Sequence, residues 1–261
     1  MGISKGAIRL LGMEFGARKA AGNVITYGVQ KVEATHAEAV NLLRVRGGDS
    51  APAADGRVSQ ETLFRLLGFE SVESIDVYDA ESPTHLLDLN RPVPAALHGR
   101  YDALYDGGTL EHCFSTAEAL CNAVRLVKPG GRVIHHVPLN NWVDHGFYQF
   151  SPTLFFDFYA ANGFDDLSMA LHFMGRKRES YVPYDPRDGA RLPYSFGGAG
   201  KTLVFFGARK AATLAEPVFP IQGRYRRAFG GEAQPQAPLG PLRRLRRSIA
   251  KRTYRLRAKP L

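Results

Sequence analysis

Two short segments of the sequence carry side chains that can take part in proton transfer. The segment DHGFYQF contains His145 and Tyr148, and the segment LEH contains His112. An imidazole titrates near neutral pH, so a histidine in an accessible loop can take a proton from a reacting group. We take His145 as the first candidate for a general base; Tyr148 and Gln149 beside it, and the pair Glu111-His112, are further candidates for the chemistry. A purely structural role is the alternative for each of them.

No cluster of residues in the sequence shows the spacing of a metal site. His135 and His136 lie within a predicted strand, which favours packing over ligand binding. Cys113 and Cys121 are too few for a disulfide framework and form no CxxC pair. We therefore predict two free thiols and no metal centre.

Acidic residues and glycines follow several predicted strands. Asp76 lies at the end of the run VESIDV, Asp88 lies in HLLDL, and Asp106 and Gly107 follow YDALY. Carboxylates accept hydrogen bonds, and a glycine lets the backbone approach a ligand closely. Ligands of open α/β sheets lie across the carboxyl ends of the strands, so these residues are candidates for one binding site.

Strands alternate with helices along most of the chain, which is typical of an α/β fold with a parallel sheet. Seven strands are predicted, at 23–28, 72–77, 85–89, 101–105, 132–137, 164–171 and 202–206. Helices are predicted at 3–20, 35–43, 59–67, 116–127 and 152–162. The last two strands follow each other without a crossover helix, so we expect one antiparallel edge strand.

The segment YDALYDGGTLEHCFSTAEALCNAVRLVKPGGRVIHHVP, residues 101–138, resembles the central signature of the class I S-adenosylmethionine-dependent methyltransferases. In that family a strand reads "fD" before a hydrophobic residue, a loop carries LEH, and LKPGG leads from a helix into the next strand. The corresponding residues here are Tyr101-Asp102, Leu110-Glu111-His112 and 127–131. The segment FYQFSPTLFFDFYAANGF, residues 147–164, also resembles the family's substrate-side helix and its exit.

The resemblance implies a three-layer, Rossmann-like fold that binds S-adenosyl-L-methionine. Asp76, with Val77 beside it, matches the position that accepts the ribose hydroxyls, and Asp79 is the fallback. Asp88 matches the acceptor for the adenine amine, and Leu89 would pack against the ring. The alternatives are that Asp76 only ends a strand and that Asp88 only forms an Asx turn.

The first cofactor loop departs from the family pattern. A GxGxG-like run normally follows the first strand, but this chain has a single glycine there, Gly28, followed by Val29 and Gln30. A β-branched valine resists a left-handed backbone, while the amide of Gln30 can replace a backbone donor. Asp106 and Gly107 match the place of the cofactor's amino-acid end. Gly28, Gln30, Asp106 and Gly107 are therefore among the predicted cofactor residues, and Val29 is not.

The function that the resemblance implies is methyl transfer to a small-molecule or glycan-type acceptor. His145, Tyr148 and His112 would then lie on the acceptor side, where neighbouring aromatic residues either wall a pocket or belong to the core. The alternative is a non-catalytic methyltransferase-like binding or scaffold protein, which the degenerate first loop favours. The missing GxGxxG argues against a dehydrogenase.

The net charge of +9 comes from the end of the chain. Residues 240–261 contain nine basic and no acidic residues, so the rest of the chain is formally neutral. We predict an N-terminal amphipathic helix at 1–21, the main domain at 22–207, a linker rich in Pro, Gly, Ala and Gln at 208–239, and a basic amphipathic tail at 240–261. The tail suits an anionic membrane surface or an acidic partner, while nucleic acid is disfavoured.

The sequence lacks the apolar runs of a signal peptide or a membrane span. We therefore expect a cytoplasmic protein, peripheral at the membrane if the tail binds there.

Overall fold

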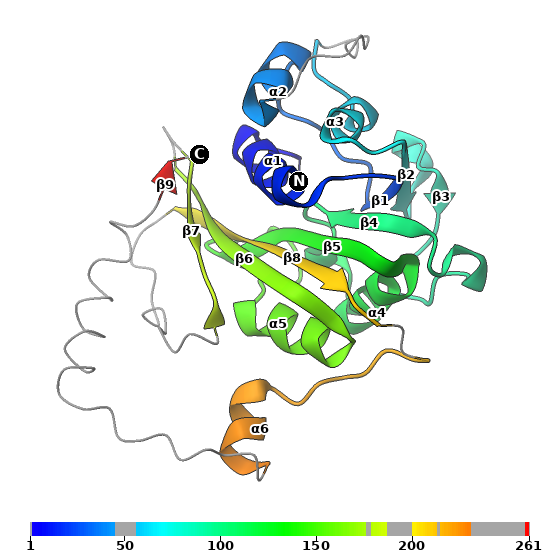
Figure 1. Ribbon diagram of the computed structural model, residues 1–261, viewed down its shortest axis with the longest axis vertical. Helices are drawn as coiled ribbons and strands as arrows, with labels where there is room; N and C mark the ends of the chain where they lie inside the picture. Colours follow the sequence, from blue (N-terminus) through cyan, green and yellow to red (C-terminus); the bar gives the residue numbers. More distant parts are fainter. Residues whose placement is uncertain are drawn as a thin grey trace, which may run out of the picture.

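One nine-stranded sheet organises the part of the chain that the computed structural model describes, residues 2–44, 56–175, 179–186, 200–212, 215–230 and 259–260 (Figure 1). Its order is β3-β2-β1-β4-β5-β8-β6-β7-β9. The strands are β1 (Asn23–Tyr27), β2 (Ser71–Asp76), β3 (His85–Leu86), β4 (Tyr101–Asp106), β5 (Val127–Asn140), β6 (Phe164–Met174), β7 (Ser180–Pro183), β8 (Lys201–Lys210) and β9 (Lys259–Pro260). The helices are α1 (Lys5–Arg18), α2 (His36–Leu43), α3 (Gln60–Leu67), α4 (Thr116–Leu126), α5 (Pro152–Ala161) and α6 (Gly223–Phe229).

The strand directions confirm the predicted α/β fold. The pairs β3–β2, β2–β1, β1–β4 and β4–β5 are parallel, and β8 runs antiparallel to both β5 and β6. Strand β8 lies inside the sheet, however, and β7 and β9 continue the sheet beyond β6 through two further antiparallel pairs, β6–β7 and β7–β9. Residues 202–208 of β8 are buried without a break, as in a strand that is covered on both faces.

Helices cover both faces of the sheet, which gives the three-layer arrangement (Figure 1). Leu104 of β4 packs in a cluster with residues of α4 and α5. Its neighbours Ala103 and Tyr105 pack in a second cluster with residues of α1 and α3. Successive side chains of a strand point to opposite faces, so each strand contributes to both clusters.

The predicted N-terminal helix is α1, and it belongs to one of these layers. Ser4 caps it, because the Ser4 side chain accepts a hydrogen bond from the backbone nitrogen of Ala7. The predicted apolar stripe of Ile8, Leu11 and Phe15 is buried against the sheet. The helix therefore supplies part of the core of the domain.

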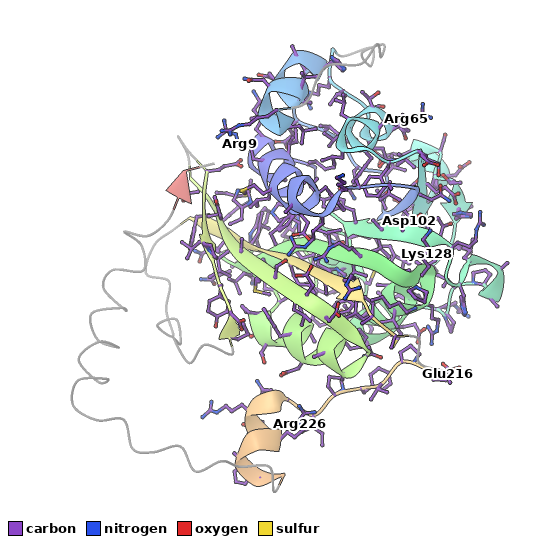
Figure 2. The ribbon with its side chains drawn as sticks, in the orientation of Figure 1. Arg9, Arg65, Asp102, Lys128, Glu216 and Arg226 are labelled. Carbon is purple, nitrogen blue, oxygen red and sulfur yellow. The ribbon has the colours of Figure 1, made fainter. Side chains whose placement is uncertain are left out.

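Asp102, the acidic residue of the "fD" motif, links three strands near their amino ends. Its Oδ2 accepts a hydrogen bond of 2.8 Å from the backbone nitrogen of Asn23, where β1 begins. Its Oδ1 lies 2.5 Å from the Nζ of Lys128, at the start of β5 (Figure 2). The motif residue thus fixes β1 and β5 to β4 at the end of the sheet opposite the strand tips described below.

The described elements differ from the predicted boundaries near the end of the chain. β8 runs to Lys210, and α6 lies within the segment that we predicted to be a linker. Apart from β9, the predicted basic tail at 240–261 lies outside the described residues, and so does the membrane association proposed for it. Among the described helices, none has both the length and the apolar character needed to cross a membrane.

Candidate functional site

The carboxyl ends of β1, β2 and β4 meet side by side. Tyr27 is in register with Ile75 on one side and with Asp106 on the other. The next residue on each strand, Gly28, Asp76 or Gly107, therefore lies at the same edge of the sheet. Gly28 has a φ of +70°, a conformation that glycine adopts without strain.

Asp76 offers one carboxylate oxygen on the side of Gly28. Its Oδ1 accepts hydrogen bonds of 2.7 and 3.2 Å from the backbone nitrogens of Val77 and Tyr78. Its Oδ2 lies 3.7 Å from the position that a Cβ at Gly28 would occupy. Val77 is 51% exposed, so the chain leaves the sheet here toward solvent. The structure thus brings three predicted cofactor residues together.

Asp88 lies on the neighbouring strand tip and also forms a turn. β3 pairs Leu86 with Asp76, so Asp88 follows two residues beyond that pair. Its Oδ1 accepts bonds of 2.9 and 2.7 Å from the backbone and side-chain nitrogens of Asn90. These bonds lower the pKa of Asp88 below its usual value. Asp88 therefore forms the Asx turn that the sequence offered as its alternative role. Leu89, the next residue, is buried.

Gln30 fills the gap between the ends of β1 and β4. Its side chain is almost fully buried, and its Nε2 donates a hydrogen bond of 2.7 Å to the carbonyl oxygen of Tyr27. The same carbonyl accepts a bond of 2.8 Å from the hydroxyl of Thr109. A Cβ at Gly107 would collide with Gln30 Oε1. Side chains thus occupy the space beside Gly28 that the family's additional glycines would leave open.

The position of Asp106 differs from the expectation that its side chain faces a ligand. Its carboxylate is fully buried, and Oδ1 accepts hydrogen bonds from the backbone nitrogens of Thr109 and Leu110. Its Oδ2 lies 2.8 Å from Nδ1 of His135, whose Nε2 lies 2.5 Å from the hydroxyl of Tyr159. Asp106 therefore stabilises the turn after β4 and orients His135.

His136 faces the opposite side of the sheet from His135. Its Nε2 lies 2.9 Å from Nδ1 of His172, and Nε2 of His172 lies 3.1 Å from Glu179. Burial lowers the pKa of His136 well below its usual value. Both strand histidines are thus buried in hydrogen-bonded networks, in agreement with their predicted packing role.

Two of the predicted catalytic residues, His145 and His112, meet at the buried side chain of Glu111. Nε2 of His145 lies 3.4 Å and Nε2 of His112 lies 3.9 Å from Oε1 of Glu111. The two imidazole ring centres are 5.1 Å apart. Burial, together with the charge of Asp106, raises the pKa of Glu111 to about 8. Burial also lowers the pKa values of His112 and His145, which favours their neutral forms.

Glu111 was named only together with its neighbour His112 in the LEH motif, and no separate role was predicted for it. The sequence around Glu111 does not indicate that its side chain is buried, because the burial depends on a distant loop. That loop, residues 141–149, folds over Glu111, and the backbone nitrogens of Phe147 and Tyr148 donate to the Glu111 carbonyl oxygen at 2.8 and 3.3 Å. A Cβ at Gly146 would lie only 2.9 Å from Glu111 Cγ.

The same loop is anchored to the start of β8. The indole nitrogen of Trp142 donates a bond of 3.1 Å to the carbonyl oxygen of Thr202. The side-chain nitrogen of Asn141 donates a bond of 2.8 Å to the carbonyl oxygen of Gly200. His145 and His112 therefore belong to different parts of the fold. The loop of His145 is bonded to the start of β8, whereas His112 lies on the short helix after β4.

The predicted aromatic group divides between the core and the surface. Trp142 and Phe150 are buried, whereas Phe147 is 67% exposed and Tyr148 is 36% exposed. The ring of Phe147 packs edge-on against exposed Phe114 with 5.7 Å between centres. The hydroxyl of Tyr148 donates a bond of 2.9 Å to the carbonyl oxygen of Phe114. An exposed aromatic rim thus lies beside the Glu111 cluster.

Comparison with solved structures finds likenesses at low sequence identity. A 16S rRNA (adenine(1408)-N(1))-methyltransferase from Catenulisporales acidiphilia is 14% identical over 78% of this chain and 94% of its own, with a TM-score of 0.37. The 1,6-didemethyltoxoflavin-N1-methyltransferase of Burkholderia thailandensis, solved with S-adenosylhomocysteine, is 15% identical over 80% of each chain, with a TM-score of 0.43. Phosphoethanolamine N-methyltransferase 2 of Haemonchus contortus, solved with S-adenosyl-L-methionine, is 13% identical over 79% of this chain and 53% of its own, with a TM-score of 0.43.

No protein-family model and no curated protein matches the sequence. The strand order and the reversed β8 give the chain the Rossmann-like fold that the sequence resemblance predicts.

Proposed function

We propose that this chain is a divergent S-adenosylmethionine-dependent methyltransferase of class I. The observation that carries the proposal is the position of Asp76 beside Gly28, where the tips of β1 and β2 meet. One oxygen of Asp76 is used by its own turn, and the other faces the glycine. A carboxylate in this place can accept hydrogen bonds from both hydroxyls of a ribose.

The rest of the strand edge suits an adenosine. Val77, which is 51% exposed, supplies apolar surface next to Asp76, while Leu89 after Asp88 is buried. At Gly107 the backbone after β4 is covered by the side chain of Gln30, and Asp106 acts from beneath as a positioning residue. When bound, S-adenosyl-L-methionine supplies a methyl group on a sulfonium. The part of the protein is to align that group with an acceptor.

The acceptor side of the site is the edge that carries His145, His112 and Tyr148. With its pKa lowered, His145 is neutral near neutral pH and has a lone pair that can accept a proton from a hydroxyl or amine acceptor. The exposed rings of Phe114 and Phe147 suit a flat or saccharide acceptor, which stacks on aromatic faces. We therefore propose a small-molecule or glycan-type acceptor.

Calorimetric titration with S-adenosylmethionine and S-adenosylhomocysteine tests the proposal. We expect binding in the micromolar range by the wild type and at least about tenfold weaker binding by Asp76→Asn, which keeps the turn acceptor but replaces the other oxygen with a donor. Glu70→Gln, an exposed carboxylate just before the opposite end of β2, is the control and should bind like the wild type.

A non-catalytic binding or scaffold role is the second candidate. The observation in its favour is that the side chains of Gln30 and Thr109 fill the space beside Gly28. Failure of the wild type to bind either nucleoside ligand would overturn the methyltransferase proposal and leave this alternative.

A further inference from the structure

Glu111, His112 and His145 have the spacing of metal ligands. One ligand atom from each residue lies within 4.8 Å of the other two. The Glu111 oxygen is 3.4 Å from the imidazole nitrogen of His145 and 3.9 Å from that of His112. Two tetrahedral ligands, each about 2.1 Å from a zinc ion, lie about 3.4 Å apart. Little rearrangement would place all three atoms around one ion.

The ligand atoms of this cluster lack other partners. The Glu111 side chain is fully buried, and neither of its oxygens has a hydrogen-bond partner among the described residues. Nε2 of His145 is buried and also without a hydrogen bond within that part of the chain. Buried polar atoms without a hydrogen-bond partner are costly, so their retention here points to a ligand that compensates them.

The backbone around the cluster is fixed in advance. Glu111 and His112 are consecutive residues of one short helix, and the loop with His145 is hydrogen-bonded to the Glu111 carbonyl through Phe147 and Tyr148. Gly146 permits this close approach because it has no side chain. Ligands held in place by such contacts lose little freedom when an ion binds.

We propose that Glu111, His112 and His145 bind a divalent transition-metal ion, with Zn²⁺ as the preferred ion. Two imidazoles and one carboxylate suit zinc, whereas Mg²⁺ and Ca²⁺ prefer oxygen ligands alone. Three protein ligands leave a position open, and the partial exposure of His112, 45%, and His145, 28%, puts solvent within reach of it. An ion there takes up the lone pair of His145, which then no longer serves as a base.

The proposal concerns ion binding and does not rest on methyl transfer. Its test is calorimetric titration of the metal-free full chain with ZnCl₂, together with the visible spectrum of the Co²⁺-substituted protein. We expect a saturable Zn²⁺ site of one ion per chain, no heat from MgCl₂ at the same concentrations, and the strong visible bands of low-symmetry cobalt. Glu111→Gln should weaken Zn²⁺ binding at least tenfold, and Glu70→Gln, an exposed glutamate, should leave it unchanged.

Absence of saturable Zn²⁺ binding by the wild type would overturn the proposal. Unchanged affinity and stoichiometry in Glu111→Gln would also overturn it. Should Glu111→Gln lose its folded circular-dichroism spectrum, His112→Ala provides the same test at a half-exposed position. Titration of the metal-free protein with S-adenosylhomocysteine separates failure of the metal site from failure of the proposed methyltransferase activity.

Discussion

The side-chain amide of Gln30 donates a hydrogen bond of 2.7 Å to the carbonyl oxygen of Tyr27, and this bond fixes the loop that follows β1. The backbone nitrogen of Gln30 is held as well, since it donates a bond of 2.8 Å to Oε1 of Gln60 on α3. A loop that the family builds from glycines is here built from hydrogen-bonded side chains.

Gln30→Ala should therefore reduce both stability and ligand binding. The substitution empties a buried position and removes one bond to Tyr27, so we expect the free energy of unfolding to fall by about 2 kcal/mol. Binding of S-adenosylhomocysteine should weaken because the loop loses its support. Urea unfolding and calorimetry measure the two effects, with Lys31→Ala on the exposed neighbour as control. Tighter binding by Gln30→Ala would contradict this and show that the amide blocks the ligand.

Tyr159→Phe should measure how much the buried network of Asp106, His135 and Tyr159 contributes to the free energy of unfolding. The change removes only the hydroxyl that lies 2.5 Å from Nε2 of His135, and both side chains are fully buried. The nitrogen loses its partner, so we expect a loss of about 1–3 kcal/mol in the free energy of unfolding. Tyr148→Phe, which removes a hydroxyl at an exposed position, should cost less than about 1 kcal/mol. Equal effects of the two substitutions in chemical unfolding would argue against the network.

Asp166 should make stability depend on pH in the acid range. The hydrogen bond from Arg18, assisted by the charge of Arg132, lowers the pKa of Asp166 from 3.8 to about 2 in the folded protein. A lowered folded-state pKa contributes stability that is complete above the unfolded value and is lost as the pH falls from about 4 to about 2.

We expect this contribution to be about 1 kcal/mol, because Asp166 is 45% exposed and water screens its ion pairs. Asp166→Asn should remove it, and asparagine tolerates the φ of +46° found there. The measurement is urea unfolding at pH 7 and pH 3, with Asp165→Asn as the adjacent control. A difference between wild type and Asp166→Asn that is the same at both pH values would refute the assignment.

Gly146→Ala should move the loop with His145 away from Glu111. The added Cβ would lie 2.9 Å from both Cγ and the carbonyl oxygen of Glu111, so the loop must shift. We expect a loss of about 1–3 kcal/mol in stability and weaker Zn²⁺ binding. Gly16→Ala in α1 is the control, because no atom lies within 4 Å of its Cβ position and alanine favours a helix. Zn²⁺ affinity equal to that of the wild type would count against the proposed metal ligands.

Much of the architecture could be predicted because it depends on local patterns. The alternation of apolar runs and capped helices located β1, β4 and α1, and the missing crossover helix indicated that one late strand is reversed. The place of β8 between β5 and β6 could not be derived in this way, since pairing partners depend on contacts across the whole sheet. The prediction of an edge strand was therefore wrong for β8, whose residues 202–208 are buried without a break.

The candidate site was predictable where it lies at strand ends and unpredictable where it depends on loops. Asp76 and Gly28 come together because parallel strands end at the same edge. The burial of Glu111 and its approach to His145 depend on a loop that reverses at Asn141 and Asp144, both with positive φ values. Sequence spacing does not indicate such a contact, because Glu111 and His145 are far apart along the chain.

The loop with His145 connects two parts of the sheet that are far apart in the sequence. It is bonded to the Glu111 carbonyl through Phe147 and Tyr148, and to the start of β8 through Trp142 and Thr202. The separation of the two imidazoles is therefore set jointly by the turn after β4 and by the start of β8, whereas Asp76 at the end of β2 takes no part in it.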